Sequence, residues 1–226
     1  MLYWKGAKMK KKKNEFLNLE TFRLTGVPSI DSQYEYGFPV SKTINIYGEE
    51  MVGKTRTALK ICETTIREYN KKVYYFNVDG GITIEMLSSM GLVDLLYDKK
   101  ENPEGKLHIL NMSFIGDIFC LMNLVTKDQE TGLVVIDTDA GIINEDPENR
   151  LKKRLGGHKA KTWSNYTQKI IAMFKYSNAS LIIISQMRYS YKGFHPQLVS
   201  TANRSIKYIS NHSLRILKDG EIQKIR

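Results

Sequence analysis

The chain has 226 residues, which is enough for one compact α/β core and leaves little for a second domain. Its hydrophobic content of 42% is ordinary for a globular protein, and no apolar run approaches the roughly 18–20 residues that a membrane-spanning helix needs. The polar, basic N-terminus does not read as a signal peptide, and two cysteines are too few for a disulfide framework. We therefore expect a cytoplasmic protein with no membrane partner.

The charge of the chain is strongly positive, with a formal net charge of +10 and a pI near 9.4. A basic intracellular protein often binds a polyanion, most commonly nucleic acid. Residues 8–13 (KMKKKK) supply five of the lysines, and such a block of like charge predicts a flexible basic arm over residues 1–15. Residues 16–226 are then expected to form one ATPase core. Charge alone leaves both solubility and nucleic-acid binding open as its role.

After the basic arm, short β-branched runs alternate with longer amphipathic stretches, which is typical of parallel βαβ units. The expected strands cover residues 43–47, 73–78, 107–111, 133–136 and 181–185. The expected helices between them cover residues 54–70, 84–90, 115–125 and 162–176. The near-continuous apolar runs at 133–136 and 181–184 indicate strands buried on both faces. Residues 206–226 predict two or three antiparallel strands with a turn at Asp219-Gly220. The predicted fold is α/β, with a mostly parallel central sheet flanked by helices.

Residues 48–55 (GEEMVGKT) match the phosphate-binding pattern G-x-x-x-x-G-K-T and lie between a predicted strand and a predicted helix. Gly48 and Gly53 allow backbone N–H groups to turn toward a phosphate, Lys54 reaches the β- and γ-phosphates, and the Thr55 hydroxyl reaches Mg²⁺. The sequence therefore predicts ATP and Mg²⁺ as cofactors. The expected nucleotide contacts are Gly48, Glu49, Glu50, Met51, Val52, Gly53, Lys54, Thr55 and Arg56.

Three polar residues end predicted strands, where ligands bind in open α/β sheets. Asp137 follows the apolar run LVVI and is expected to complete the metal site with Thr55. Asp79 ends the strand at 73–78, where it can polarise an attacking water or simply begin a turn at Gly80-Gly81. Gln186 ends the strand LIIIS, where it can sense the γ-phosphate or simply be a satisfied polar residue. Spacing alone does not decide between these alternatives.

These sites, in this order, resemble the RecA superfamily of DNA recombinases, which includes archaeal RadA and RadB and the phage UvsX proteins. The resemblance rests on several stretches that together cover about residues 25–217. They are Thr25-Gly26 with Ile30-Asp31, the phosphate loop, Asp79-Gly80-Gly81-Ile82 with the following ITIEMLSSMGL, VVIDT, SNASLIIISQMR, and Ala202-Asn203 with Ile206-Lys207-Tyr208. Membership implies a RecA-like nucleoside triphosphatase core with antiparallel C-terminal strands.

The resemblance also implies roles for single residues. Lys54 and Asp79 would be catalytic, and Gln186 would couple the γ-phosphate to DNA. Asp79 stands where the family has a glutamate, and the shorter side chain implies slow turnover. Met86 stands where the family usually has Tyr or Arg over the adenine, so it is the expected base contact.

The family's two DNA-binding loops would correspond to residues of about 140–158 and 188–204. The expected DNA contacts are Arg150, Lys152, Lys153, Arg154, Arg188, Tyr189, Tyr191, Lys192, Phe194 and Arg204. Cations that track phosphates, mixed with rings that stack on bases, suit single-stranded nucleic acid. The plainer alternatives are a solvated helix start for residues 150–154 and ordinary packing for the aromatic residues.

The resemblance favours an ATP-dependent recombinase core, a DNA-dependent ATPase that coats single-stranded DNA as a filament and promotes homologous pairing or strand exchange with duplex DNA. A second hypothesis is a low-turnover RadB-like accessory or single-strand annealing protein, which the short Asp79 and the small size favour. A DnaB-type hexameric helicase motor, assembled as a ring, and a KaiC-like signalling ATPase are the remaining alternatives. Filament formation, ring formation and sequence preference are not fixed by the sequence.

Overall fold

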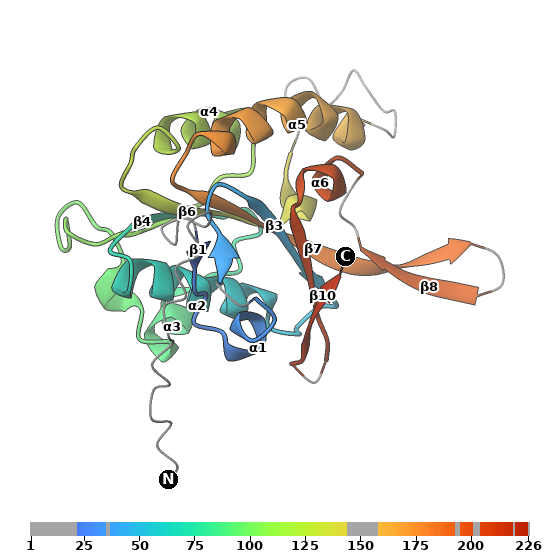
Figure 1. The fold of residues 1–226 in the computed structure, drawn as a ribbon, viewed down its shortest axis with the longest axis horizontal. Coiled ribbons are helices and arrows are strands. Elements are labelled where there is room, and N and C mark those ends of the chain that lie inside the picture. Colours follow the sequence, from blue (N-terminus) through green and yellow to red (C-terminus); the bar gives the residue numbers. More distant parts are fainter. Residues whose placement is uncertain are drawn as a thin grey trace, which may run out of the picture.

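The computed structural model describes residues 22–34, 37–143, 158–192, 195–200, 204–218 and 220–225. Its main feature is a twisted sheet with helices on both faces (Figure 1). The strands are β1 (Phe22–Arg23), β2 (Phe38–Pro39), β3 (Thr43–Gly48), β4 (Lys72–Asn77), β5 (Leu107–Leu110), β6 (Thr131–Asp137), β7 (Ser180–Lys192), β8 (His195–Ser200), β9 (His212–Ile216) and β10 (Ile222–Ile225). The helices are α1 (Pro28–Asp31), α2 (Lys54–Arg67), α3 (Ile84–Ser89), η2 (Val93–Leu95), α4 (Ile115–Val125), η3 (Asp139–Gly141), α5 (His158–Lys175) and α6 (Arg204–Ile209).

The strand order in the main sheet is β10-β9-β3-β7-β6-β4-β5. All neighbours from β9 to β5 are parallel, whereas β10 is antiparallel to β9, and β8 is antiparallel to the second half of β7. Parallel strands need crossover connections, and helices provide most of them here. The predicted fold class, a mostly parallel α/β sheet with antiparallel C-terminal strands, is confirmed.

Two hydrophobic clusters fill the spaces between the sheet and its helices. One lies between the sheet and the layer of α1, α2 and α3, and includes Ile46, Leu59 and Val135. The other lies beneath α4, α5 and α6, and includes Met122 and Phe174. Strand β6 is buried along its whole length because both faces are covered, which explains its continuous apolar run.

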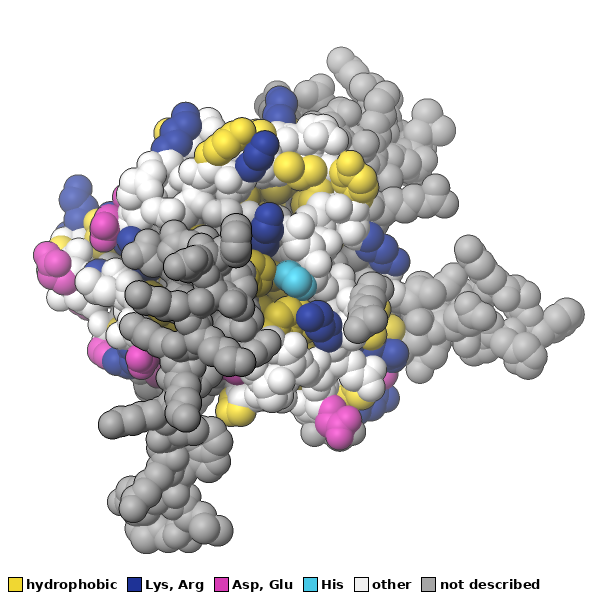
Figure 2. All heavy atoms as spheres, viewed as in Figure 1, with side chains coloured by type: hydrophobic (Ala, Val, Ile, Leu, Met, Phe, Trp, Pro, Cys, Tyr) yellow, Lys and Arg dark blue, Asp and Glu magenta, His cyan; other side chains and the backbone are white. Residues whose placement is uncertain are grey.

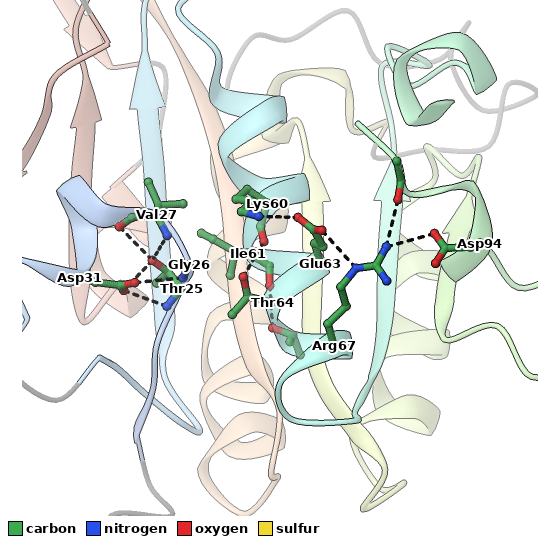
Figure 3. Close-up of polar contacts among 12 residues, drawn as sticks. Thr25, Gly26, Val27, Asp31, Lys60, Ile61, Glu63, Thr64, Arg67 and Asp94 are labelled. Carbon is green, nitrogen blue, oxygen red and sulfur yellow. Dashed lines mark hydrogen bonds and ion pairs between the residues drawn. The ribbon is translucent and has the colours of Figure 1, made fainter. Parts of the chain in front are cut away.

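The segment before β3 is anchored to α2 through a compact turn, shown in Figure 3. The Asp31 carboxylate accepts hydrogen bonds from the Thr25 N–H (2.8 Å), the Thr25 hydroxyl (2.7 Å) and the Gly26 N–H (3.0 Å). Gly26 has a φ of 72°, and a Cβ atom there would lie 2.0 Å from the Thr64 hydroxyl oxygen. Glycine is therefore required by both the backbone conformation and the close approach to α2.

The C-terminal third differs from the prediction in two places. Residues 204–209 form helix α6, which overlaps the start of the segment 206–226, where two or three antiparallel strands are predicted. The segment predicted as the second DNA loop contains the second half of β7 and β8, which pair as a hairpin from Met187↔Ser200 to Lys192↔His195. The hairpin formed by β9 and β10 agrees with the prediction, and β9 extends the parallel sheet through β3. No helix in the described part of the chain is long and apolar enough to span a membrane.

Candidate functional site

The phosphate loop joins β3 to α2, and its backbone geometry explains its glycines. Gly53 has a φ of 94°, in the left-handed region, and stands immediately before the first residue of α2. A Cβ atom at Gly48 would lie 2.6 Å from the carbonyl oxygen of Ile216 and 2.9 Å from a methyl group of Val52. The glycines therefore let the loop pass into α2 without a clash of side chains. The backbone N–H groups at the N-terminus of α2 then border the loop, which is an arrangement that can bind an anion.

Lys54 is 8% exposed, and its ammonium group donates hydrogen bonds to the carbonyl oxygens of Gly48 and Glu49. Burial lowers the pKa of Lys54, whereas the negative charges of Asp137 and Glu50 oppose that shift. The lysine is thus held over the loop by two uncharged carbonyl acceptors, which anionic phosphate oxygens can replace. Arg56, in the first turn of α2, is exposed.

Asp137 lies at the end of β6, and two hydroxyl groups converge on its carboxylate. Thr55 Oγ1 donates to Asp137 Oδ2 at 2.7 Å, and the Tyr75 hydroxyl donates to the same oxygen at 2.7 Å. Burial raises the pKa of Asp137, while the hydrogen bonds from Tyr75 and Thr55 act in the opposite direction. Burial also raises the pKa of Tyr75, and the adjacent carboxylate adds to that shift. The structure brings Thr55 and Asp137 together, as the sequence predicted for a metal site.

These residues fit a magnesium nucleotide. The Thr55 hydroxyl and the Asp137 carboxylate are hard oxygen ligands in direct contact. Mg²⁺ in nucleotide sites usually takes one or two protein ligands and completes its shell with phosphates and water. The described residues contain no group of three or more His, Cys, Asp or Glu side chains placed to hold a metal ion.

Asp79 follows β4 on the same edge of the sheet, beside Asp137. Its carboxylate accepts a 2.8 Å hydrogen bond from the hydroxyl of Thr138, the residue after Asp137. A Cβ atom at Gly141 would lie 2.1 Å from Asp79 Oδ1, so this glycine provides the space that the carboxylate occupies. Asp79 is exposed despite these contacts, which leaves it accessible to water.

Gln186 belongs to β7, the central neighbour of β3. In the parallel pairing of the two strands, Gln186 is the register partner of Gly48, the first residue of the phosphate loop. Six residues further along, the same strand ends at Lys192 in the β7–β8 hairpin. One continuous strand therefore connects the phosphate loop to the segment predicted to contact DNA.

Met86 lies on α3 and is partly buried against the cluster that contains Leu59 and Val135. Of the other loop residues, Met51 is fully exposed, and Glu49 forms an ion pair with Lys218 at 3.0 Å. The sequence did not predict a role for Lys218. It also did not predict the role of Tyr75, because a tyrosine in a buried strand normally signals only packing.

The expected DNA contacts are only partly placed. Arg188, Tyr189, Tyr191 and Lys192 lie in β7, and Arg204 begins α6. Arg150, Lys152, Lys153, Arg154 and Phe194 lie outside the described residues. At the root of the hairpin, an open cleft of about 710 Å³ is bordered by Met187 and Ser200, and its lining includes Lys207, Arg215 and Lys224.

A family model described as the RecA N-terminal domain matches residues 2–226. Among similar proteins, protein RecA of Mycoplasma mycoides subsp. mycoides SC is 26% identical over 227 residues, covering 98% of this chain and 61% of that protein. Protein RecA of Mycoplasma pneumoniae is 24% identical over 193 residues, covering 84% of this chain and 54% of that protein. Protein RecA of Ureaplasma parvum serovar 3 is 29% identical over 184 residues, covering 80% and 51%. This chain spans between half and about three fifths of the length of these relatives.

Proposed function

The chain belongs to the RecA family, and we propose that it is an ATP-gated recombinase core that coats single-stranded DNA and promotes its pairing with a homologous duplex. The observation that carries this proposal is the course of β7. Its Gln186 stands beside Gly48 in the sheet, and its far end forms the hairpin with the basic and aromatic residues. A change at the phosphate loop can thus be transmitted to the hairpin along a single strand.

The proposed site residues divide the work between binding and catalysis. Magnesium ATP, when bound, would supply the terminal phosphoryl group that is transferred to water. Lys54 would exchange its two carbonyl acceptors for phosphate oxygens, and Thr55 with Asp137 would hold the metal. Tyr75 fixes the orientation of the Asp137 carboxylate through its hydroxyl. Arg56 and Met86 are proposed to border the nucleotide.

Asp79 is proposed to orient the attacking water and to accept its proton. Support comes from the Thr138 hydroxyl, which fixes one carboxylate oxygen, and from the exposure of the side chain. An aspartate reaches one methylene less far than a glutamate, so turnover is proposed to be slow. The low-turnover accessory or annealing protein is therefore the second candidate, and Asp79 is the observation that favours it.

DNA contacts are proposed for the residues around the hairpin and for the basic segment that follows Asp137. In the hairpin, Arg188, Tyr189, Tyr191 and Lys192 would meet the strand, and the cleft at its root adds Lys207, Arg215 and Lys224 to the positive field. Arg150, Lys152, Lys153 and Arg154, with Phe194 and Arg204, complete the proposed set. Assembly into a helical filament in the cytoplasm, with a basic arm over residues 1–15, is part of the same proposal.

The test is the rate of ATP hydrolysis with and without single-stranded DNA, combined with electron microscopy of the same samples. We expect hydrolysis that DNA stimulates, together with helical filaments on the DNA. Replacing Lys54 by Ala should lower turnover at least about 100-fold, because the phosphates lose their main cation. DNA binding without turnover would favour the accessory protein, and rings that unwind forked DNA would favour a helicase. Absence of nucleotide-dependent DNA binding would contradict the proposal.

A further inference from the structure

The phosphate loop contains two glutamates, Glu49 and Glu50, at a place where the proposed function requires a polyanion to bind. The negative charge of the Glu49 carboxylate is compensated by Lys218, a lysine from a distant part of the chain. The Glu49 Oε2 atom lies 3.0 Å from the Nζ atom of Lys218, with side-chain exposures of 28% for Glu49 and 74% for Lys218. Lys218 lies in the turn between β9 and β10, so the pair connects the loop to the C-terminal hairpin.

The backbone places this turn firmly beside the loop. Strand β9 is the parallel neighbour of β3, with Ile216 as the register partner of Gly48. At that point the backbones come so close that a Cβ atom at Gly48 would lie 2.6 Å from the Ile216 carbonyl oxygen. The turn itself is closed by hydrogen bonds from the Leu217 N–H to the Glu221 carbonyl (2.9 Å) and from the Gly220 N–H to the Leu217 carbonyl (3.1 Å). Lys218 therefore extends toward Glu49 from a turn whose backbone is held in place by hydrogen bonds.

Glu49 is held at two points. Its carbonyl oxygen accepts a hydrogen bond from Lys54, and its carboxylate pairs with Lys218. An unpaired Glu49 carboxylate would add a negative charge close to the lysine that must receive the phosphates. Its repulsion would be stronger for a triphosphate than for a diphosphate, because the triphosphate carries one more negative charge.

We propose that Lys218 is a positioning residue for nucleotide binding, which neutralises the Glu49 carboxylate and holds it away from the phosphates. The inference rests on the proposed nucleotide-binding function of the loop. It assigns to the β9–β10 turn an electrostatic role in that site, and the role is exerted through Glu49.

The experiment is a double-mutant cycle on the full chain, with dissociation constants for fluorescent ATP and ADP analogues at low and high salt. Lys218→Gln should weaken ATP binding by roughly two- to fivefold at low salt, which is the range that exposed ion pairs support. The effect should be smaller for ADP and should shrink at high salt. Glu49→Gln combined with Lys218→Gln should restore affinity close to that of the wild type, and Lys218→Arg should retain it.

Lys100→Gln is the matched control, because Lys100 is an exposed lysine near β5, at the opposite edge of the sheet. It removes the same charge and should leave both affinities unchanged. The inference is overturned if Lys218→Gln leaves the affinity for ATP unchanged. It is also overturned if Lys218→Gln weakens ATP binding by the same factor in the wild type and in the Glu49→Gln variant. Failure of the wild-type chain to bind either nucleotide would instead contradict the proposed function itself.

Discussion

The Asp137 carboxylate illustrates how a site residue can reduce the stability of the fold that holds it. Burial raises its pKa, and the charge of Asp79 adds to the shift, so the folded protein binds the proton more tightly than the unfolded chain does. Stability is therefore lost as the pH rises through the raised pKa.

Replacing Asp137 by Asn should raise the melting temperature at neutral pH, because burial penalises the ionised carboxylate but not a neutral amide. The amide oxygen can still accept from Thr55 and Tyr75, and no charge is buried. The difference from the wild type should narrow toward pH 4, and ATP hydrolysis should be lost at every pH. Thermal unfolding between pH 4 and pH 8 checks this. A lower melting temperature for the variant at neutral pH would contradict the assigned effect of burial.

Gly141 gives a way to move Asp79 without replacing it. A methyl group at position 141 would lie 2.1 Å from Asp79 Oδ1, and this exposed side chain can shift to make room. We expect Gly141→Ala to lower turnover at least about 10-fold by misplacing the carboxylate, with nucleotide affinity and melting temperature nearly unchanged. Gly116→Ala, which has open space around its Cβ position, is the matched control. Equal turnover in the two variants would show that Asp79 does not orient the water.

The individual residues differ in how far the sequence could predict them. Gly48, Lys54 and Thr55 are fixed by a motif whose steric reasons are general, and Asp137 by its position at the end of an apolar strand. The contact of Tyr75 with Asp137 depends on two strands being neighbours in the sheet, and the Glu49–Lys218 pair depends on a contact across 169 residues of sequence. No local pattern in the sequence contains such information.

At the scale of elements, the turn around Asp31 positions the chain that leads into β3. Its carboxylate satisfies two backbone N–H groups and one hydroxyl, and the turn lies against α2 (Figure 3). Asp31→Ala should lower the free energy of unfolding by roughly 1–3 kcal/mol, because the donors lose their charged acceptor. Thermal or denaturant unfolding measures the loss. Glu101→Ala removes an exposed acid from a turn and serves as the control. A loss no larger than that of Glu101→Ala would contradict the anchoring role.

The β7–β8 hairpin is the element on which DNA binding is proposed to depend. Tyr191→Ala should weaken binding to a single-stranded oligonucleotide by roughly 1–3 kcal/mol if the ring stacks on a base. Lys192→Gln should reduce the steepness of a plot of log binding constant against log salt concentration by about 0.7, which is the slope for one phosphate contact on a single strand. Neither change should alter nucleotide affinity in the absence of DNA, and Ser190→Ala on the same strand is the control. Unchanged DNA affinity in both variants would remove the hairpin from the proposed interface.

Most elements of the parallel sheet were predictable because strand and helix periods alternate clearly. Helix α4 has the predicted bounds, 115–125. Strand β3 ends one residue later than predicted, and β4 is shifted by one residue at both ends. Strand β7 was predicted to end at residue 185 because the apolar run ends there, and its polar continuation is stabilised by pairing with β8. Helix α6 has only six residues. It was missed because the strand prediction for residues 206–226 began inside it.

At the scale of the whole molecule, strand order brings the site together. Strands β3, β7 and β6 are parallel neighbours in the centre of the sheet. Gly48, Gln186 and Asp137 therefore lie together on the side of the sheet where β3 and β6 have their C-terminal ends. Hydrophobic periodicity predicts parallel strands but not their order, and the order of the strands in the sheet is first seen in the structure. Figure 2 shows Lys and Arg side chains spread over the face in view, while Asp and Glu lie mainly toward its left side and bottom. This distribution suits a partner that is a polyanion.

The most direct test of the account is whether ATP controls the affinity for single-stranded DNA. Fluorescence anisotropy of a labelled oligonucleotide, titrated with protein in Mg²⁺ and either a non-hydrolysable ATP analogue, ADP or no nucleotide, measures this coupling. We predict binding at least about tenfold tighter with the ATP analogue than without nucleotide, a coupling of about 1.4 kcal/mol, and loss of that difference in Gln186→Ala. The same affinity under all three conditions would contradict the account.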